Sequence, residues 1–249
     1  MFPIRDHNPS ERTPWVTYAL IALNLAVFAG YFSLFADEAR LVAFFDRWAL
    51  IPARVSAGEG YVTVLTSMFL HGGLLHLGGN MLFLWIFGDN LEDAFGHLGF
   101  FVFYLACGAL ASLTQVFPSP DSTVPMVGAS GAIAGVMGGY LLLFPKARVD
   151  VIVILIIIIR RFALPAWVML GVWFGIQLAG SYTSFGINEG GVAHLAHSGG
   201  FAAGVLLALP WWLRRGGPGF WRRNDGAPPH PPTPVEVRPT SIPTVRRRR

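Results

Sequence analysis

The feature that most constrains this chain is a series of apolar blocks about as long as a bilayer is thick. A helix needs roughly 20 predominantly apolar residues to cross the hydrocarbon core. Hydrophobic residues make up 53% of the 249 residues and charged residues only 13%, whereas a soluble domain carries about 25% charged residues. Lipid is therefore the predicted solvent for most of the chain, and the expected fold class is an all-α membrane protein.

Six apolar blocks are predicted to cross the membrane. They are residues 14–35, 74–95, 98–117, 130–144, 164–185 and 192–213. Gly96 breaks the chain between the second and third spans, and Pro145 ends the fourth. Residues 36–70 form a long loop with amphipathic patches, which is predicted to lie at the membrane interface. The apolar stretch 149–159 is only about half a span long, and an extended segment is favoured there over a further span.

The two ends of the chain are polar. Residues 1–13 show no cleavable signal pattern, so the first span is expected to stay as an N-terminal membrane helix behind a short cytoplasmic segment. Residues 214–249 hold nine Arg and eight Pro, which predicts a disordered basic tail. Basic segments next to spans mark the cytoplasmic side, so both termini are expected there, with the tail facing anionic lipid rather than nucleic acid. Lys146 is the one lysine among 18 basic residues, and this Arg bias favours a bacterial inner membrane.

Polar residues gather at the starts of the second, fourth and sixth predicted spans. The three clusters are HGGLLHLGGN from His71 to Asn80, GASGA from Gly128 to Ala132, and HLAHSGG from His194 to Gly200. Even-numbered spans all begin on the outer side, so these clusters share one membrane depth. Polar groups inside a bilayer are costly and tend to mark function. The sequence therefore predicts a hydrated pocket near the outer surface.

Two stripes of glycine at intervals of four predict that the fourth and sixth spans pack closely. The stripes are Gly131, Gly135 and Gly139 in the fourth span, and Gly200 and Gly204 in the sixth. Ser130 comes just before the first stripe and His197 shortly before the second. Close contact of the stripes is expected to bring the Ser130 hydroxyl and the His197 imidazole to the same height.

The three clusters resemble the signature motifs of the rhomboid family of intramembrane serine proteases. The matching segments are GASG around Ser130, HLGGN from His76 to Asn80, and AHSGGFAAG around His197. The resemblance covers residues 13–213 and implies a six-helix bundle with Ser130 as nucleophile, His197 as general base, and His76 and Asn80 in the oxyanion hole.

The same resemblance implies what the protein acts on. The substrates would be other membrane proteins, cleaved in a segment that unwinds easily near the outer face. Access would lie beside the fifth span, where Trp167, Trp173 and Phe174 are candidates for a gate, although lipid-facing packing explains these side chains as well and is favoured. The first loop departs from the family pattern, because Tyr61-Val62 stands where many rhomboids carry Trp-Arg. The segment GDNLE (88–92) resembles a structural GxxxE feature, for which ordinary helix-end chemistry is favoured.

The residue types also indicate the chemistry. A serine hydroxyl needs a base to become nucleophilic, and His197 is the candidate. All 14 acidic residues fall in loops, tails or helix ends, and Glu189 lies outside the sixth span, so a Ser–His dyad is expected rather than a triad. Ser130 begins a helix and offers its backbone N–H as an oxyanion donor. His76 and Asn80, at i and i+4, face the same way and add two side-chain donors.

Other classes of function fit the sequence less well. A catalytically silent rhomboid-like protein that binds membrane clients is the main alternative, although such proteins usually lack the Ser or His that are both present here. A transporter would need a polar path across the whole membrane. The histidines at 71, 76, 194 and 197 converge without a carboxylate or thiolate, so no metal or other cofactor is expected. Packing or a water contact is expected for His194, and His71 has no assigned role.

Overall fold

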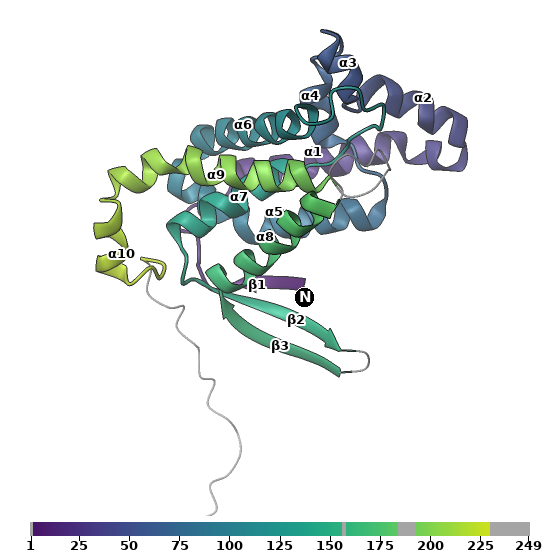
Figure 1. Ribbon diagram of the computed structural model, residues 1–249. Coiled ribbons are helices and arrows are strands. Elements are labelled where there is room, and N and C mark those ends of the chain that lie inside the picture. The colour runs from purple at the N-terminus through teal and green to yellow at the C-terminus, as the bar shows by residue number, and fades with distance from the viewer. Residues whose placement is uncertain (1, 156–157, 184–192, 230–249) are drawn as a thin grey trace, which may run out of the picture.

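The computed structural model describes residues 2–155, 158–183 and 193–229, and it is mostly helical. In this described part, six helices of 14 residues or more form a bundle (Figure 1). They are α1 (Trp15–Tyr31), α5 (Leu74–Phe95), α6 (His97–Val116), α7 (Ser130–Leu143), α8 (Ala166–Thr183) and α9 (His194–Arg214). Each coincides within a few residues with one of the predicted spans. The break at Gly96 is also confirmed, since its φ of 74° lies in the region that favours glycine.

Helix α7 lies at the centre of the bundle and packs against α5, α6, α8 and α9. Its residues from Gly131 to Tyr140 are all buried. The glycine stripes explain how its backbone and that of α9 come so close. A Cβ added at Gly204 would lie 1.9 Å from the Gly135 carbonyl oxygen, and one added at Gly200 would lie 2.1 Å from that of Gly131. The predicted contact between the two stripes is therefore confirmed.

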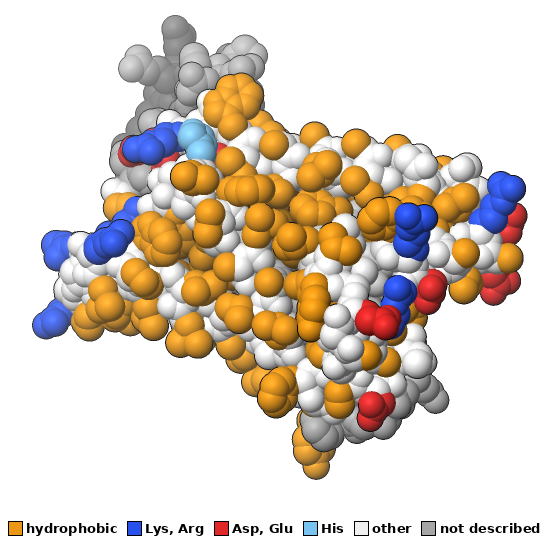
Figure 2. Space-filling model, turned by 90° about the horizontal axis from the view of Figure 1, so that it is seen from above, with side chains coloured by type: hydrophobic (Ala, Val, Ile, Leu, Met, Phe, Trp, Pro, Cys, Tyr) orange, Lys and Arg blue, Asp and Glu red, His pale blue; other side chains and the backbone are white. Residues whose placement is uncertain are grey.

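Several helices are suited to a bilayer by length and composition. In the described part, Trp15–Ala36 (α1 and the 3-10 helix η1, Phe32–Ala36) and α6 are long and apolar enough to cross a membrane, and the pair Thr63–Phe69 and Leu74–Phe95, bent by 94°, is a third candidate. Helix α7 is a shorter apolar helix of 14 residues. Hydrophobic side chains cover the middle of the face in Figure 2, and charged side chains gather towards its ends. A large apolar surface of this kind marks contact with a membrane or a protein partner.

The connection between α1 and α5 is built from short helices. They are η1, α2 (Glu38–Trp48), α3 (Pro52–Ser56), α4 (Thr63–Thr66) and η2 (Ser67–Phe69). Helix α2 is amphipathic, and its Phe44 stacks on Tyr31 of α1 with 4.8 Å between ring centroids. Tyr61 and Val62, where the family pattern departs, are exposed.

The prediction of an all-α fold was wrong at one end of the bundle, because the chain also forms a three-stranded antiparallel sheet. Its strands are β1 (Phe2–Asp6), β2 (Arg148–Leu155) and β3 (Ile158–Pro165), in the order β1-β2-β3. The preference for an extended segment at 149–159 is confirmed, as its run of β-branched residues favours strands. Strand β3 continues to Pro165, so α8 begins at Ala166 rather than at 164.

Two aspartates hold this sheet in place, and their surroundings shift their pKa values in opposite directions. Asp150 of β2 contacts Arg161 of β3 and His7. Burial by itself would raise the Asp150 pKa, but these two partners lower it below the ordinary value. Asp6 of β1 instead accepts a hydrogen bond from the Tyr140 hydroxyl at 2.7 Å. Burial, opposed by the Tyr140 hydrogen bond and assisted by the nearby Asp89, raises the Asp6 pKa to about 7.

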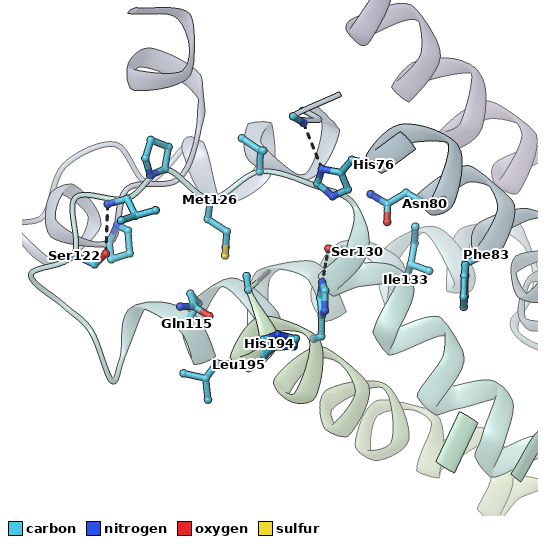
Figure 3. A pocket seen from close by; sticks show the side chains of 18 of the residues that line it. His76, Asn80, Phe83, Gln115, Ser122, Met126, Ser130, Ile133, His194 and Leu195 are labelled. Atoms are coloured by element: carbon cyan, nitrogen blue, oxygen red, sulfur yellow. Dashed lines mark hydrogen bonds between the residues drawn. The ribbon is translucent and has the colours of Figure 1, made fainter. Parts of the chain in front are cut away.

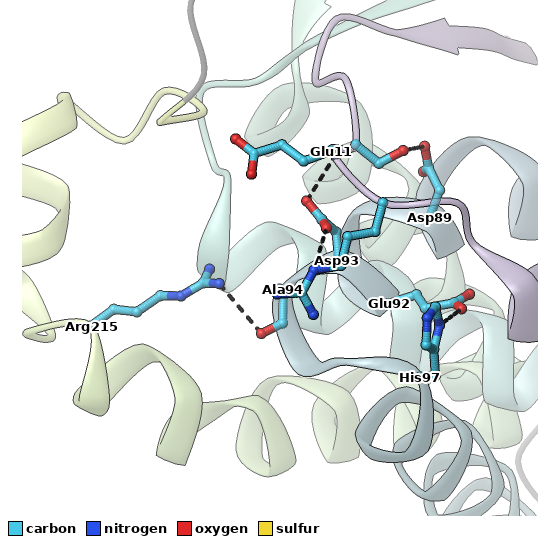
Figure 4. Close-up of polar contacts among 9 residues, drawn as sticks. Glu11, Asp89, Glu92, Asp93, Ala94, His97 and Arg215 are labelled. Carbon is cyan, nitrogen blue, oxygen red and sulfur yellow. Dashed lines mark hydrogen bonds and ion pairs between the residues drawn. The ribbon is translucent and has the colours of Figure 1, made fainter.

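The buried Glu92 near the end of α5, drawn beside His97 in Figure 4, holds the start of α1. Its carboxylate accepts from the backbone N–H groups of Val16 and Thr17 at 2.9 and 2.8 Å, and from the Thr17 hydroxyl at 2.8 Å. His97 contacts the same carboxylate. Gly88 faces Thr17, and an added Cβ would lie 3.0 Å from the threonine methyl group. The favoured interpretation of this segment as ordinary helix-end chemistry was therefore wrong, because Gly88 and Glu92 link α5 to the N-terminus of α1, which a carboxylate stabilises.

The C-terminal segment departs from the expected disorder in its first part. Helix α9 reaches Arg214, and a further helix, α10 (Pro218–Asn224), follows it. Trp221 of α10 packs on Trp212 with ring centroids 4.9 Å apart and donates to the Leu142 carbonyl oxygen at 3.0 Å. This indole anchor explains why composition alone was misleading here. Residues 230–249 of the predicted tail lie outside the described part.

Candidate active site

The three polar clusters meet in one cavity of about 620 Å³. Its lining includes His76, Asn80, Ser130, His194 and His197, which come from α5, α7 and α9 (Figure 3). The first turns of α7 and α9 and the first two turns of α5 supply these side chains. The predicted convergence of the clusters at one level of the bundle is therefore confirmed.

Ser130 and His197 are in direct contact. The Ser130 Oγ lies 2.7 Å from the His197 Nε2, across the close packing of α7 and α9 (Figure 3). Ser130 is the first residue of α7, so its backbone N–H belongs to the helix turn that has no intrahelical acceptor. Gly128, two residues earlier, has a φ of 128°, and its N–H donates to the Ser67 carbonyl oxygen at 2.9 Å. The loop that presents the serine is thus tied to η2.

The other side of the His197 ring faces a neutral amide. Its Nδ1 lies 2.9 Å from the Gln177 Oε1 of α8. Within the described part of the chain, the hydrogen-bond partners of this ring are Gln177 and Ser130, neither of which is an acid. Trp173, one turn before Gln177, places its ring centroid 6.0 Å from that of His197.

His76 and Asn80 of α5 line the same cavity as Ser130 (Figure 3). The Gly72 N–H donates to the His76 Nδ1 at 3.3 Å, so the ring proton is on Nε2 when the imidazole is neutral. That Nε2 faces Gly128, where an added Cβ would come within 2.8 Å of it. The buried Asn80 Nδ2 has no hydrogen-bond partner among the described residues. Two N–H donors are thus available beside the serine.

The two remaining histidines have different surroundings. His71 is buried, and its backbone exchanges hydrogen bonds of 2.7 and 2.8 Å with the Tyr31 hydroxyl. Its ring lies edge-on to that of His76, with centroids 5.1 Å apart. His194 directs its Nδ1 to the Gln177 Oε1 at 2.9 Å, so a side-chain hydrogen bond replaces the packing or water contact expected from sequence. In the described ranges, no group of three or more potential ligands is arranged to hold a metal.

Sequence reasoning missed Gln177, and it treated three aromatic residues of α8 together, as a possible gate or as lipid-facing packing. Gln177 is a polar residue inside an apolar span, which is the signal that could have identified it. Trp173 lines the cavity, and Phe174 stacks on Phe201 with centroids 4.5 Å apart. Trp167 is exposed. Glu189 falls in the range 184–192, outside the described residues.

Comparison with known proteins identifies the family. The family model described as "Rhomboid domain" matches residues 58–214. The chain belongs to the rhomboid family. It is 29% identical over 80% of its length to "Rhomboid protein 1, mitochondrial" of Saccharomyces cerevisiae, covering 54% of that protein. It is 32% identical over 79% of its length to "Rhomboid protease GluP" of Bacillus subtilis, covering 36%. "RHOMBOID-like protein 4" of Arabidopsis thaliana is 34% identical over 71% of this chain, covering 40% of the relative.

Family membership settles the broad class of the protein. Rhomboids are membrane proteins and generally intramembrane serine proteases, in agreement with the apolar helices described above. The chain spans about half or less of the length of these relatives. These relatives do not establish the expected bacterial inner membrane, because one is bacterial, two are eukaryotic, and one of those two is named as mitochondrial.

Proposed function

We propose that this rhomboid is an active intramembrane serine endopeptidase that cleaves transmembrane segments of other proteins near the outer membrane face. The observation that carries the proposal is the 2.7 Å contact between the Ser130 Oγ and the His197 Nε2. This contact lies in a cavity that also presents the N–H donors of His76 and Asn80. Nucleophile, base and oxyanion donors are thus within one site, as acyl transfer requires.

The reaction follows from these positions. His197 Nε2 takes the Ser130 hydroxyl proton while Oγ attacks the scissile carbonyl carbon, and the carbonyl oxygen becomes an oxyanion. The Ser130 backbone N–H, the Asn80 Nδ2 and the His76 Nε2–H stabilise that oxyanion. The protonated His197 then gives its proton to the leaving amine, which releases one product and leaves an acyl-enzyme ester. Water, deprotonated by His197, hydrolyses the ester and restores the hydroxyl.

The position of the cavity supports cleavage near one membrane face. In the proposed topology, α1, α5, α6, α7, α8 and α9 are the six spans. The cavity lies at the N-terminal ends of α5, α7 and α9, whereas the sheet and α10 lie at the other end of α7, so both termini are assigned to the cytoplasmic side (Figure 1). Helix α7 has 14 residues and is about 21 Å long, which is shorter than the ~30 Å hydrocarbon core. Ser130 would therefore sit below the outer surface, within reach of water.

Substrate access is proposed beside α8. Trp173 lines the cavity on this side, and Phe174 of α8 stacks on Phe201 of α9. A helical substrate must unwind before its peptide bond can be attacked, because helix hydrogen bonds shield it. Segments with Gly, Pro or other weak helix formers are therefore the expected targets.

Labelling with a fluorophosphonate probe tests the nucleophile. The wild-type protein is expected to react, and Ser130→Ala is expected not to react. Ser112→Ala, which removes another buried serine in a membrane helix, serves as the matched control and is expected to label normally. Equal labelling of Ser130→Ala and the wild type would rule out the assignment.

Cleavage of a single-span model substrate separates the protease from a silent client-binding protein. The wild type is expected to cut the substrate in liposomes, and His197→Ala is expected to bind it without cutting. Binding without cleavage by the wild type, together with no labelling of Ser130, would favour the silent alternative.

A further inference from the structure

The structure answers a question that a Ser–His dyad leaves open, namely what orients the base. Gln177 of α8 is buried, and its Oε1 lies 2.9 Å from the Nδ1 of His197 and 2.9 Å from the Nδ1 of His194. A carbonyl oxygen has two lone pairs and can accept both hydrogen bonds. One amide therefore holds two imidazoles of α9 that are one helix turn apart.

This arrangement determines where the His197 proton sits. Because an amide oxygen can only accept, the ring nitrogen that faces it must carry the proton. A neutral imidazole has one N–H, so His197 with its proton on Nδ1 has an unprotonated Nε2. That Nε2 is the atom 2.7 Å from the Ser130 Oγ, and it is the atom that must accept the serine proton.

The opposite amide orientation would have the opposite consequence. Its NH2 group would donate to both Nδ1 atoms, so both rings would carry their proton on Nε2. His197 would then present an N–H to Ser130 and could not act as its base. The two orientations therefore differ in a property that can be measured, which is the tautomer of His197.

Further contacts join α8 to α9 around Gln177. Trp173 and Gln177 are separated by one turn of α8, and both face His197. One turn further on, the Ser181 Oγ lies 3.1 Å from the Ser198 Oγ of α9. Gly180 allows His194 to approach, since an added Cβ would lie 2.6 Å from its ring. Gln177 is not among the described residues that line the cavity, and it lies behind the two histidines that do.

We propose that Gln177 is the positioning residue of this protease, with its amide oxygen in the orienting role that a carboxylate has in a serine-protease triad. The inference rests on the proposed function, because it assigns a partner to the proposed base. A neutral amide suits a site inside the bilayer, where an ionised carboxylate would be costly. The residue acts through His197 and has no contact with substrate.

Three variants test the proposal. Gln177→Met keeps the length of the side chain but removes the acceptor, and Gln177→Glu keeps an acceptor oxygen. Ser181→Ala is the matched control, because it removes another polar contact between α8 and α9 without touching His197. For Gln177→Met, kcat is expected to fall roughly 10- to 10³-fold with little change in KM, below the ~10⁴-fold loss that a wrong histidine tautomer causes in a triad. Gln177→Glu is expected to recover most of the loss, and Ser181→Ala to leave kcat within about threefold of wild type.

A spectroscopic measurement separates orientation from packing. Nitrogen NMR of ¹⁵N-histidine-labelled protein, with the His197 signals assigned by their absence in His197→Ala, reports which ring nitrogen is protonated. The wild type is expected to show His197 with its proton on Nδ1, and Gln177→Met is expected to lose this preference while retaining the wild-type melting temperature. A wild-type proton on Nε2, or equal kcat losses for Gln177→Met and Ser181→Ala, would overturn the inference.

The same experiments distinguish this failure from that of the proposed function. If wild-type Ser130 labels and the protein cleaves its substrate, but Gln177→Met does both at the wild-type rate, only the role of Gln177 is wrong. If wild-type Ser130 does not label at all, the proposed protease activity fails first, and the tautomer measurement still shows whether Gln177 orients His197.

Discussion

The two ends of the bundle contain polar networks of opposite character. At and behind the cavity, the polar groups are a serine, a glutamine, an asparagine and histidines. At the other end, the linked groups include ionisable acids and bases, with Asp150 between Arg161 and His7, and Glu92 against His97. Charged groups are costly inside lipid and tolerable near water. This chain therefore uses neutral hydrogen-bonding groups for its proposed chemistry and charged groups to fasten its structure.

The largest effect is expected from removing an oxyanion donor at the cavity. Asn80→Ala is expected to lower kcat by roughly 10²- to 10³-fold, as loss of one such donor does in serine proteases. The melting temperature should change little, because the Asn80 amide nitrogen has no partner among the described residues to lose. Initial rates on the model substrate and thermal unfolding in detergent measure both quantities. A stability loss that accounts for the lost activity would show that Asn80 is structural.

At the other end, Glu92 is expected to give the reverse pattern. Glu92→Ala leaves the N–H groups of Val16 and Thr17 without their acceptor at the start of α1. The free energy of unfolding should fall by roughly 2–4 kcal/mol, because a buried hydrogen-bonded acceptor is lost. The activity per folded molecule should stay close to wild type. Thermal unfolding measures the stability, and active-site labelling counts the folded molecules. A loss of kcat without a loss of stability would mean that Glu92 acts in the chemistry, as proposed for the cavity end, and not in fastening the structure.

The sheet allows a test by pH, because its two aspartates respond in opposite directions. The Asp6 pKa is raised from 3.8 to about 7, so between these values the folded protein binds more protons than the unfolded chain. Its contribution to stability is therefore present below pH ~4 and is lost as the pH rises towards 7. In Asp6→Asn, the stability should fall less steeply over this pH range. Melting temperatures measured from pH 4 to 8 give the comparison, and an unchanged slope in Asp6→Asn would refute it.

Asp150 should act in the opposite sense. Its pKa is lowered by Arg161 and His7 despite the effect of burial, so its contribution is present above the unfolded pKa and is lost as the pH falls below it. Asp150→Asn should therefore destabilise the protein at neutral pH, with a difference from wild type that shrinks towards pH 3. A difference that stays constant with pH would show that the charge of Asp150 does not matter.

The sequence was most informative about features that follow from a single physical rule. Bilayer thickness defined the apolar helices, and glycine spacing predicted the contact between Gly131 and Gly200 and between Gly135 and Gly204. The shared membrane depth of the polar clusters predicted that Ser130 and His197 lie in one cavity. These features are periodic or local, so a single chain reveals them.

The sequence was less informative where a contact joins distant segments. Strand β1 pairs with β2 across roughly 145 residues of sequence, and no local pattern marks the partner. Trp221 anchors α10 on α7 and α9 within a segment whose composition suggests disorder. Gln177 required knowledge of which face of α8 meets α9. Each of these depends on tertiary packing rather than on residue type.

The smallest effect is expected from an exposed ion pair at the charged end. Lys146 and Asp225 are 2.7 Å apart, but their side chains are 50% and 90% exposed. Solvent screening limits such a pair to about 0–1 kcal/mol, so Lys146→Ala should barely move the melting temperature at any salt concentration. This pair lies at the same end of the bundle as Glu92, and it is charged but exposed. Comparing Lys146→Ala with Glu92→Ala therefore separates the effect of charge from the effect of burial. A loss as large as that of Glu92→Ala would mean that charge itself, rather than buried hydrogen bonding, fastens this end of the molecule.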